Sequence, residues 1–222
     1  MLIQFVECSA ETLKMPTLKL TYPNLKGRAE AIRLAFYIGG VEFEDYRIKH
    51  DDIPELKPLL PFQQLPVLTV DGKIIGQSYA LLRYAGTLGK LYPRDPFQAL
   101  LVDQIIFQIQ DIENAIRATF VEKGTDKRME IRDNLVKDIW PKQFDGLETV
   151  LATYGGTAAV GDSISIADIV IYLVVSDIKS GKYDGIPSTL LDSYSKVTTC
   201  YQFMLEHPKI KSWDELGKHN IQ

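Results

Sequence analysis

The stretch Pro61-Phe-Gln-Gln-Leu-Pro-Val-Leu-Thr-Val-Asp-Gly-Lys-Ile-Ile-Gly-Gln-Ser78 decides the fold of the first part of this chain. Two runs rich in β-forming residues, Val67–Val70 and Lys73–Gly76, are separated only by Asp71-Gly72. Asp-Gly between two apolar runs predicts a hairpin with a type I′ turn, because this turn needs φ > 0 at both of its central residues.

A helix is expected directly after this hairpin. Tyr79–Ala85 has helical character, and Ser78 stands where the residue that caps a helix N-terminus is expected. The free N–H groups and the dipole of such a terminus favour a carboxylate or a phosphate. On the other side of the hairpin, Pro66 cannot donate a ladder hydrogen bond, so we expect the backbone of Leu65 to be free to pair with a ligand. The two features together suggest a site for a small peptide-like anion.

The segment before the hairpin predicts a strand, a helix and a second strand. Thr17–Tyr22 alternates in polarity, Arg28–Ile38 has apolar residues at helical spacing up to Gly39-Gly40, and Phe43–Ile48 is again β-rich. Such a unit forms a parallel strand pair with a right-handed crossover. With the hairpin and its helix, the order of elements matches a thioredoxin-like fold. We expect residues 1–16 to be an extension ahead of this core.

The second half of the chain predicts helices only. Leu88–Pro96 is rich in Gly and Pro and forms a natural linker. Asp126–Tyr154 predicts a long helix, and Ser165-Ile-Ala-Asp168 has the spacing of a capping box ahead of the apolar segment Ile169–Val175. Another long helix is predicted by apolar residues three or four positions apart, at Leu101, Ile105, Ile109, Ile112 and Ile116. We expect a helical bundle that has no catalytic constellation of its own.

Composition narrows the class of protein. The chain has 222 residues, of which 45% are hydrophobic and 24% charged, as in an ordinary globular protein. Its net charge of −4 and the lack of a basic run argue against a nucleic-acid binder. No apolar run approaches the roughly eighteen residues of a membrane span. Cys8 and Cys200 form no CxxC motif, which fits a reducing compartment, and the three histidines have no zinc-ligand spacing.

Three motifs in order resemble a cytosolic glutathione transferase, with the sigma class as the closest. They are Leu18-Lys-Leu-Thr-Tyr-Pro-Asn-Leu-Lys-Gly-Arg-Ala-Glu30, Leu60-Pro-Phe-Gln-Gln-Leu-Pro-Val-Leu68 and Asp71-Gly-x-x-x-x-Gln-Ser78. The resemblance covers the chain from residue 17 to about residue 215. It implies a thioredoxin-like glutathione-binding domain at residues 17–92, an all-helical domain at residues 97–222, a homodimer and a cytoplasmic location.

The resemblance gives Tyr22 and Arg28 the central roles. The end of the first strand carries no cysteine, so dithiol exchange is excluded there. A free thiol has a pKa of ~8.5, and lowering that pKa by about two units needs roughly 2.7 kcal/mol of preference for the thiolate. The stabilisation of a thiolate by one hydroxyl aimed at the sulfur and a nearby guanidinium is of this order. Without the motifs, Tyr22 would be read as a core tyrosine and Arg28 as a solvated residue; with them, Tyr22 activates the thiol and Arg28 supports it.

The same resemblance implies the other glutathione contacts. Leu65 would pair with the cysteinyl backbone, next to a cis Pro66, and Gln77 and Ser78 would hold the γ-glutamyl carboxylate. Asp111 would reach the γ-glutamyl ammonium of the neighbouring subunit. The remaining expected contacts are Gln63 and Gln64, together with Lys57 and Ile53 near the glycyl end, where many sigma enzymes have Trp in place of Ile53.

The second substrate is expected in a pocket walled by Leu25, Ala115 and Ala118. Ala118 stands where prostaglandin D synthases have a stacking aromatic, which argues against that isomerase activity and for a more open pocket. Phe107 and Gln110 replace two aspartates of the metal-binding relatives, so we expect no metal.

Three functions are open at this point. The first is conjugation of glutathione to small hydrophobic electrophiles. The second is glutathione-dependent isomerisation or peroxide reduction, which needs the same thiolate. The third is a non-catalytic structural relative, although such proteins usually lose pocket residues, and here Tyr22, Arg28, Gln77 and Ser78 are present.

Overall fold

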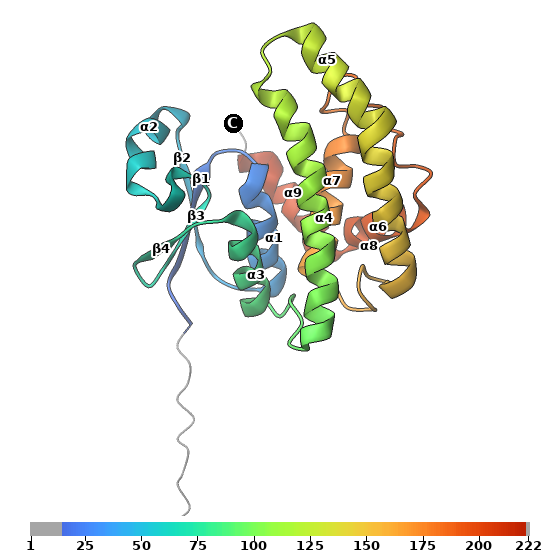
Figure 1. Cartoon of the computed structure of the whole chain (residues 1–222). Helices are drawn as coiled ribbons and strands as arrows, with labels where there is room; N and C mark the ends of the chain where they lie inside the picture. Colours follow the sequence, from blue (N-terminus) through green and yellow to red (C-terminus); the bar gives the residue numbers. More distant parts are fainter. Residues whose placement is uncertain (1–14, 221–222) are drawn as a thin grey trace, which may run out of the picture.

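The computed structural model of the chain describes residues 15–220, without the side chains of residues 218–220. Most of the expected N-terminal extension, including Cys8, lies outside the described residues. Figure 1 shows a small sheet beside a larger group of helices, with α1 and α3 between them. No helix of the described range is long and apolar enough to cross a lipid bilayer.

The first part of the chain has the predicted thioredoxin-like topology. Its four strands are β1 (Leu18–Pro23), β2 (Glu44–Ile48), β3 (Val67–Val70) and β4 (Lys73–Ile75), in the spatial order β2-β1-β3-β4. β1 and β2 are parallel, as the strand–helix–strand unit requires, whereas β1–β3 and β3–β4 are antiparallel. The fold prediction is therefore confirmed.

The hairpin has the predicted turn geometry. Asp71 and Gly72 both have positive φ, 46° and 82°. The Leu65–Pro66 peptide bond is cis, as the resemblance implied. Between β2 and β3 the chain forms a short helix α2 (Ile53–Leu56), flanked by 3₁₀ turns at His50–Asp52, Lys57–Leu59 and Pro61–Gln63.

Two helices cover one face of this sheet. α1 (Glu30–Gly39) follows a 3₁₀ turn at Gly27–Ala29 and ends at Gly40, which has the left-handed φ of 66° that such a helix end favours. α3 (Ser78–Leu88) begins one residue earlier than predicted. The prediction that Ser78 caps this helix is wrong: Gln77, with φ of 73°, occupies the capping position, and its carbonyl accepts the first helical hydrogen bond, from Leu81, at 3.0 Å.

The rest of the chain is all-helical. α4 (Pro96–Val121) is the predicted long helix, and it begins with the Asp95 side chain accepting the Gln98 N–H. The later helices are α5 (Thr125–Asn134), α6 (Trp140–Tyr154), α7 (Ile166–Lys179), α8 (Ser195–Glu206) and α9 (Pro208–Asn220). The predicted capping box is present at the start of α7, where Asp168 is buried and accepts the Ser165 N–H at 2.8 Å.

The single helix predicted over residues 126–154 is interrupted. A π-helical turn at Leu135–Ile139 separates α5 from α6, and the Trp140 N–H bonds the Leu135 carbonyl five residues back. Pro141 has no N–H for an ordinary helical bond, which accounts for the wider turn directly before it. The hydrophobic periodicity continues through this turn, so the sequence pattern did not reveal it.

The two parts of the chain share one hydrophobic core. Gly86 of α3 lies so close to α7 that an added Cβ would be 2.6 Å from the Ile166 side chain. The Ile166 N–H also bonds the Leu91 carbonyl of the linker at 2.9 Å. These contacts hold the end of α3 and the linker against the start of α7.

Candidate functional site

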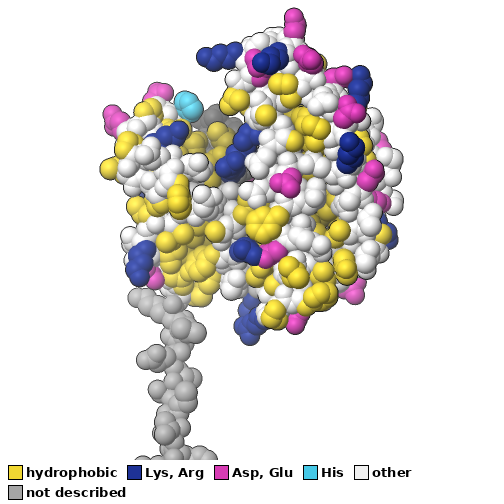
Figure 2. Space-filling model, viewed as in Figure 1, with side chains coloured by type: hydrophobic (Ala, Val, Ile, Leu, Met, Phe, Trp, Pro, Cys, Tyr) yellow, Lys and Arg dark blue, Asp and Glu magenta, His cyan; other side chains and the backbone are white. Residues whose placement is uncertain are grey.

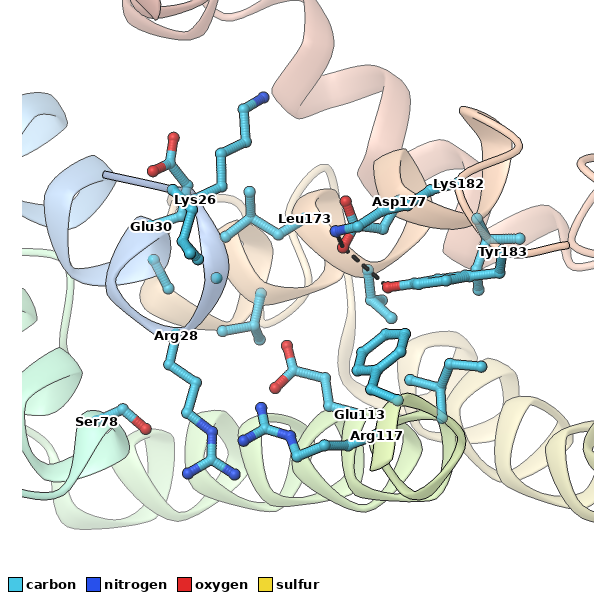
Figure 3. Close-up of a pocket in the computed structure, with 18 of the residues that line it drawn as sticks. Lys26, Arg28, Glu30, Ser78, Glu113, Arg117, Leu173, Asp177, Lys182 and Tyr183 are labelled. Carbon is cyan, nitrogen blue, oxygen red and sulfur yellow. Dashed lines mark hydrogen bonds and ion pairs between the residues drawn. The ribbon is translucent and has the colours of Figure 1, made fainter. Parts of the chain in front are cut away.

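A cavity of about 690 Å³ opens where the two parts of the chain meet. The segment between β1 and α1 and the start of α3 form one side, and α4, α7 and the segment after α7 form the other (Figure 3). Among its lining residues are Tyr22, Leu25, Arg28, Ser78, Tyr79, Glu113, Arg117, Leu173, Asp177 and Tyr183.

Tyr22 lies near the end of β1 and is partly buried at the cavity. Its hydroxyl oxygen accepts a hydrogen bond from the backbone N–H of Arg28, at 3.3 Å. A phenol has one proton to donate, and because this bond uses an oxygen lone pair, the proton stays available for a ligand. Gly27, with φ of 43°, allows this approach, since a Cβ there would be 2.6 Å from the Tyr22 hydroxyl oxygen.

Arg33 of α1 holds the segment that follows Tyr22, and its side chain is fully buried. One guanidinium nitrogen of Arg33 donates to the carbonyls of Leu25 and Lys26, at 2.9 and 3.3 Å. The same guanidinium pairs with Glu30 at 3.1 Å and with Asp45 at 2.9 Å. A buried arginine with two carboxylates and two carbonyls is a rigid support, so the position of Tyr22 depends on it.

The last helix, α9, adds two hydrogen bonds to this network. The indole N–H of Trp213, in α9, donates to Glu30 at 2.8 Å. The Tyr37 hydroxyl of α1 also bonds the Ser212 hydroxyl at 2.9 Å. The C-terminal helix therefore contributes to the support of the segment that carries Tyr22.

The bundle contributes charged groups to the cavity. The Tyr79 hydroxyl donates to the Glu113 carboxylate at 2.9 Å. Burial raises the pKa of Glu113, although the bond from Tyr79 and the nearby Arg117 and Arg28 oppose this. Burial and Glu113 also raise the pKa of Tyr79. The pKa of Arg117 is lowered, first by burial and then by the positive charge of Arg28.

The far end of the cavity is apolar apart from one paired carboxylate. Asp177 accepts hydrogen bonds from Lys182 at 2.7 Å and from the Tyr183 hydroxyl at 3.0 Å, and burial raises the pKa of Tyr183. The apolar walls here are Ile116, Phe120, Val170, Leu173, Val174 and Ile178. The site thus joins a polar entrance to an apolar interior.

Four residues singled out from the sequence meet at this cavity, namely Tyr22, Leu25, Arg28 and Ser78. The others lie outside its lining. Ile53 and Leu65 are partly buried, and Pro66, which follows the cis peptide bond, is buried. The exposed residues of this group are Lys57, Gln63, Gln64 and Gln77.

Leu65 and Pro66 nevertheless lie next to the cavity through the sheet register. Val67 pairs with Thr21, so the segment before Val67 leaves the sheet beside the end of β1 that carries Tyr22. Within residues 15–220, neither the N–H nor the carbonyl of Leu65 has a hydrogen-bond partner. This unpaired backbone is the free edge that the sequence predicted.

The expectation that Ala115 and Ala118 line the second pocket is wrong. The cavity is lined from α4 by Glu113, Ile116, Arg117 and Phe120, a set spaced by three or four residues that forms one face of the helix. Ala115 and Ala118 fall on other faces, and Ala118 is exposed.

From the sequence, no catalytic constellation was expected in the helical part. In the structure, however, this part supplies four polar side chains to the cavity, those of Glu113, Arg117, Asp177 and Tyr183. A signal was present in the sequence, since Glu113 and Arg117 flank the apolar stripe of α4 four positions apart. Asp111 is exposed on α4. No group of three or more His, Cys, Asp or Glu side chains in the described range is arranged to hold a metal ion.

Comparison with known proteins gives consistent results for both parts of the chain. Residues 18–87 match the family described as "Glutathione S-transferase, N-terminal domain", and residues 110–216 match "Glutathione S-transferase, C-terminal domain". Glutathione S-transferase 1 of Ascaris suum is 36% identical, over 90% of this chain and 96% of the relative. Hematopoietic prostaglandin D synthase of Gallus gallus is 32% identical, with the same two coverages of 90% and 96%.

The comparison with solved structures agrees with the match to the two glutathione S-transferase domains. A monomeric glutathione S-transferase from the hookworm Necator americanus superposes with a TM-score of 0.78 at 31% identity, covering 90% of this chain and 97% of the other.

Proposed function

The chain belongs to the glutathione S-transferase family, and from this premise we propose that it is a sigma-like member in which the Tyr22 hydroxyl activates the thiol. As a member of the family, it is an enzyme that conjugates the thiolate of glutathione to small hydrophobic electrophiles, with glutathione as its co-substrate. The class, the site residues and the assembly are the proposal.

The observation that carries the proposal is the hydrogen bond from the Arg28 N–H to the Tyr22 hydroxyl at the cavity. With its oxygen held in this way, Tyr22 donates its proton to the sulfur of bound glutathione, and Arg28 adds a positive charge. Both favour the thiolate, which is the nucleophile, over the thiol. The thiolate attacks the electrophile in the adjoining apolar part of the cavity.

The rest of the tripeptide binds along the edge of the sheet. The unpaired backbone of Leu65 pairs with the cysteinyl residue, and the start of α3 at Gln77 and Ser78 holds the γ-glutamyl carboxylate. Gln63 and Gln64 add polar contacts, while Lys57 and Ile53 face the glycyl end. In the proposed division into domains at residues 17–92 and 97–222, these contacts come from the first domain, and Asp111 of the second domain reaches the glutathione of the partner subunit.

We also propose a cytosolic homodimer. Asp111 is exposed on α4, where it can reach the γ-glutamyl ammonium in a partner subunit. Figure 2 shows hydrophobic side chains gathered on the face that carries the hairpin and α4. Large apolar residues exposed in these elements and beside them are Phe62, Ile74, Ile75, Phe97, Leu100 and Phe107. Such a surface favours association.

A second candidate function is glutathione-dependent isomerisation. It is supported by the similarity to hematopoietic prostaglandin D synthase of Gallus gallus. Against it, Ala118 stands where the resemblance places the stacking aromatic of such enzymes, and an alanine has no ring to stack on a substrate. Product analysis separates the two functions, because conjugation consumes glutathione and isomerisation returns it.

Calorimetric titration with glutathione tests the site, and steady-state turnover with a panel of electrophiles and hydroperoxides tests the reaction. We expect saturable glutathione binding and formation of a thioether product. No binding at millimolar glutathione would reject the site. Analytical ultracentrifugation tests the dimer, and a monomer at micromolar concentration that turns over at full rate would reject the role of Asp111.

A further inference from the structure

Two guanidinium groups face the same part of the cavity. Arg28 reaches it from the turn before α1 and Arg117 from α4, and Figure 3 shows their side chains pointing toward one another. Over the part of the chain that the structure describes, neither side chain has a hydrogen-bond or ion-pair partner within the distances that define one. The positive charge of Arg28 contributes to the lowered pKa of Arg117, as expected for like charges that are close together.

The carboxylates around the cavity do not neutralise these two charges. Asp177 is paired with Lys182 and Tyr183. Glu30, also in the lining, is paired with Arg33 and Trp213. The cavity is therefore left with an excess of positive charge at its polar entrance.

Glu113 is the one remaining carboxylate in the lining. It accepts the Tyr79 hydroxyl at 2.9 Å, and no nitrogen of Arg117 lies within ion-pair distance of it among the described side chains. Burial raises its pKa, which favours the neutral acid. Glu113 interacts electrostatically with Arg117, but it forms no ion pair with this guanidinium.

We infer that Arg117 makes this enzyme selective for electrophiles that carry an acidic group, such as a carboxylate, on the end that does not react. The inference rests on the proposed function, because the glutathione thiolate is then the anion that occupies Arg28. Among the described side chains Arg117 has no ion-pair partner, and it lies next to the apolar walls formed by Ile116, Phe120 and Leu173. An electrophile with an apolar body and one carboxylate matches both features, and its carboxylate forms a charge-assisted hydrogen bond with the guanidinium.

A matched pair of substrates isolates this contact. In para-chloro-meta-nitrobenzoate and para-chloro-meta-nitrobenzamide, the thiolate forms a carbon–sulfur bond, and chloride leaves with the bonding electron pair. The proton lost from glutathione passes to solvent. The two substrates have the same ring, nitro group and leaving chloride, and the group para to the chloride is an anionic carboxylate in one and a neutral carboxamide in the other. Dividing each kcat/KM by the uncatalysed rate constant with glutathione removes the difference in intrinsic reactivity.

We expect the wild-type enzyme to favour the benzoate over the benzamide by about tenfold on this scale. In Arg117→Gln the preference should disappear, and Arg117→Lys should restore part of it. Lys123→Gln is the matched control, because it removes one positive charge at an exposed position beyond the end of α4. This control should keep the preference. Raising the ionic strength to about 0.5 M should reduce the preference of the wild type, since the contact is only partly shielded from solvent.

The outcomes separate the inference from the proposed function. Turnover of the benzamide with no preference for the benzoate would overturn the role of Arg117 and leave glutathione conjugation intact. An equal loss on both substrates in Arg117→Gln would mean that Arg117 stabilises charge developing in the reaction, and it would also overturn the selectivity. Turnover of neither substrate, nor of any other electrophile, would overturn the proposed function and this inference with it.

Discussion

The hydroxyl oxygen of Tyr22 is the acceptor, not the donor, in its hydrogen bond with the Arg28 backbone N–H, at 3.3 Å. This direction decides what the phenol can do, because its proton is left for a second partner. It also ties the orientation of Tyr22 to the backbone of the turn at Gly27–Ala29 and not to a flexible side chain.

Replacing Tyr22 by Phe should slow turnover by about ten- to a hundredfold at neutral pH, since one charge-assisted hydrogen bond of roughly 1.5–3 kcal/mol is lost. The bound thiol then has a higher pKa, so the rate profile moves to higher pH and part of the loss is recovered there. Glutathione affinity should change much less. Tyr46→Phe, at an exposed position of β2, is the control. An unchanged rate and profile in Tyr22→Phe would instead point to Arg28 as the activating group.

Replacing Gly27 by Ala should damage turnover more than stability. The new Cβ would be 2.6 Å from the Tyr22 hydroxyl oxygen, so the phenol has to move. Gly40→Ala is a matched control, because Gly40 also has a positive φ, 66°, but a Cβ there meets nothing within 4 Å. Both variants should lose about 1–2 kcal/mol from the left-handed backbone. Only Gly27→Ala should lose turnover, about tenfold or more, and an equal loss in both would contradict this account.

Replacing Arg33 by Met should lower the free energy of unfolding by about 3–5 kcal/mol, because Glu30 and Asp45 lose their buried partner. The carbonyls of Leu25 and Lys26 lose their donor at the same time. Urea denaturation measures this change. Arg94→Met, at an exposed position, should have almost no effect. If Arg33→Met were as stable as the wild type, Arg33 could not be the support of the segment after Tyr22.

The pH dependence of stability should contain a contribution from Glu113. Burial raises its pKa above the ordinary value of 4.5, so from that pH upward the folded state retains a proton that the unfolded chain has released. The wild type therefore loses stability as pH rises through this window, up to the raised pKa. Glu113→Gln cannot titrate, and its amide oxygen still accepts the Tyr79 hydroxyl. The urea midpoint of Glu113→Gln relative to the wild type should rise with pH, whereas Glu55→Gln, at an exposed position, should show no such trend.

Local signals accounted for most of the fold. The turn at Asp71-Gly72, the helix end at Gly40 and the capping box at Ser165 each depend on a few neighbouring residues, so the sequence alone could predict them. Gln77 shows where this fails. Its φ of 73° is unfavourable for a glutamine, so local preferences do not predict that Gln77, and not Ser78, caps the helix.

The composition of the cavity could not be predicted in the same way. The resemblance identified Tyr22, Arg28 and Ser78, because these residues lie in motifs. The resemblance did not identify Glu113 and Arg117. The packing of α4 against α7 and the thioredoxin-like part determines which face of α4 lines the cavity, and the motifs contain no information on this packing. An error of two residues in helical phase was enough to select Ala115 and Ala118.

The hydrogen bond between Trp213 and Glu30 joins residues that are 183 positions apart in the sequence. When a chain refolds, contacts between neighbours form early, and contacts that close long loops form late, because the entropy of loop closure opposes them. The hairpin and the β1–β2 unit can thus assemble before α9 docks. On refolding from urea, circular dichroism should recover ahead of glutathione turnover, since the segment after Tyr22 gains its last support only at docking. Activity is then the last property that the folding chain acquires.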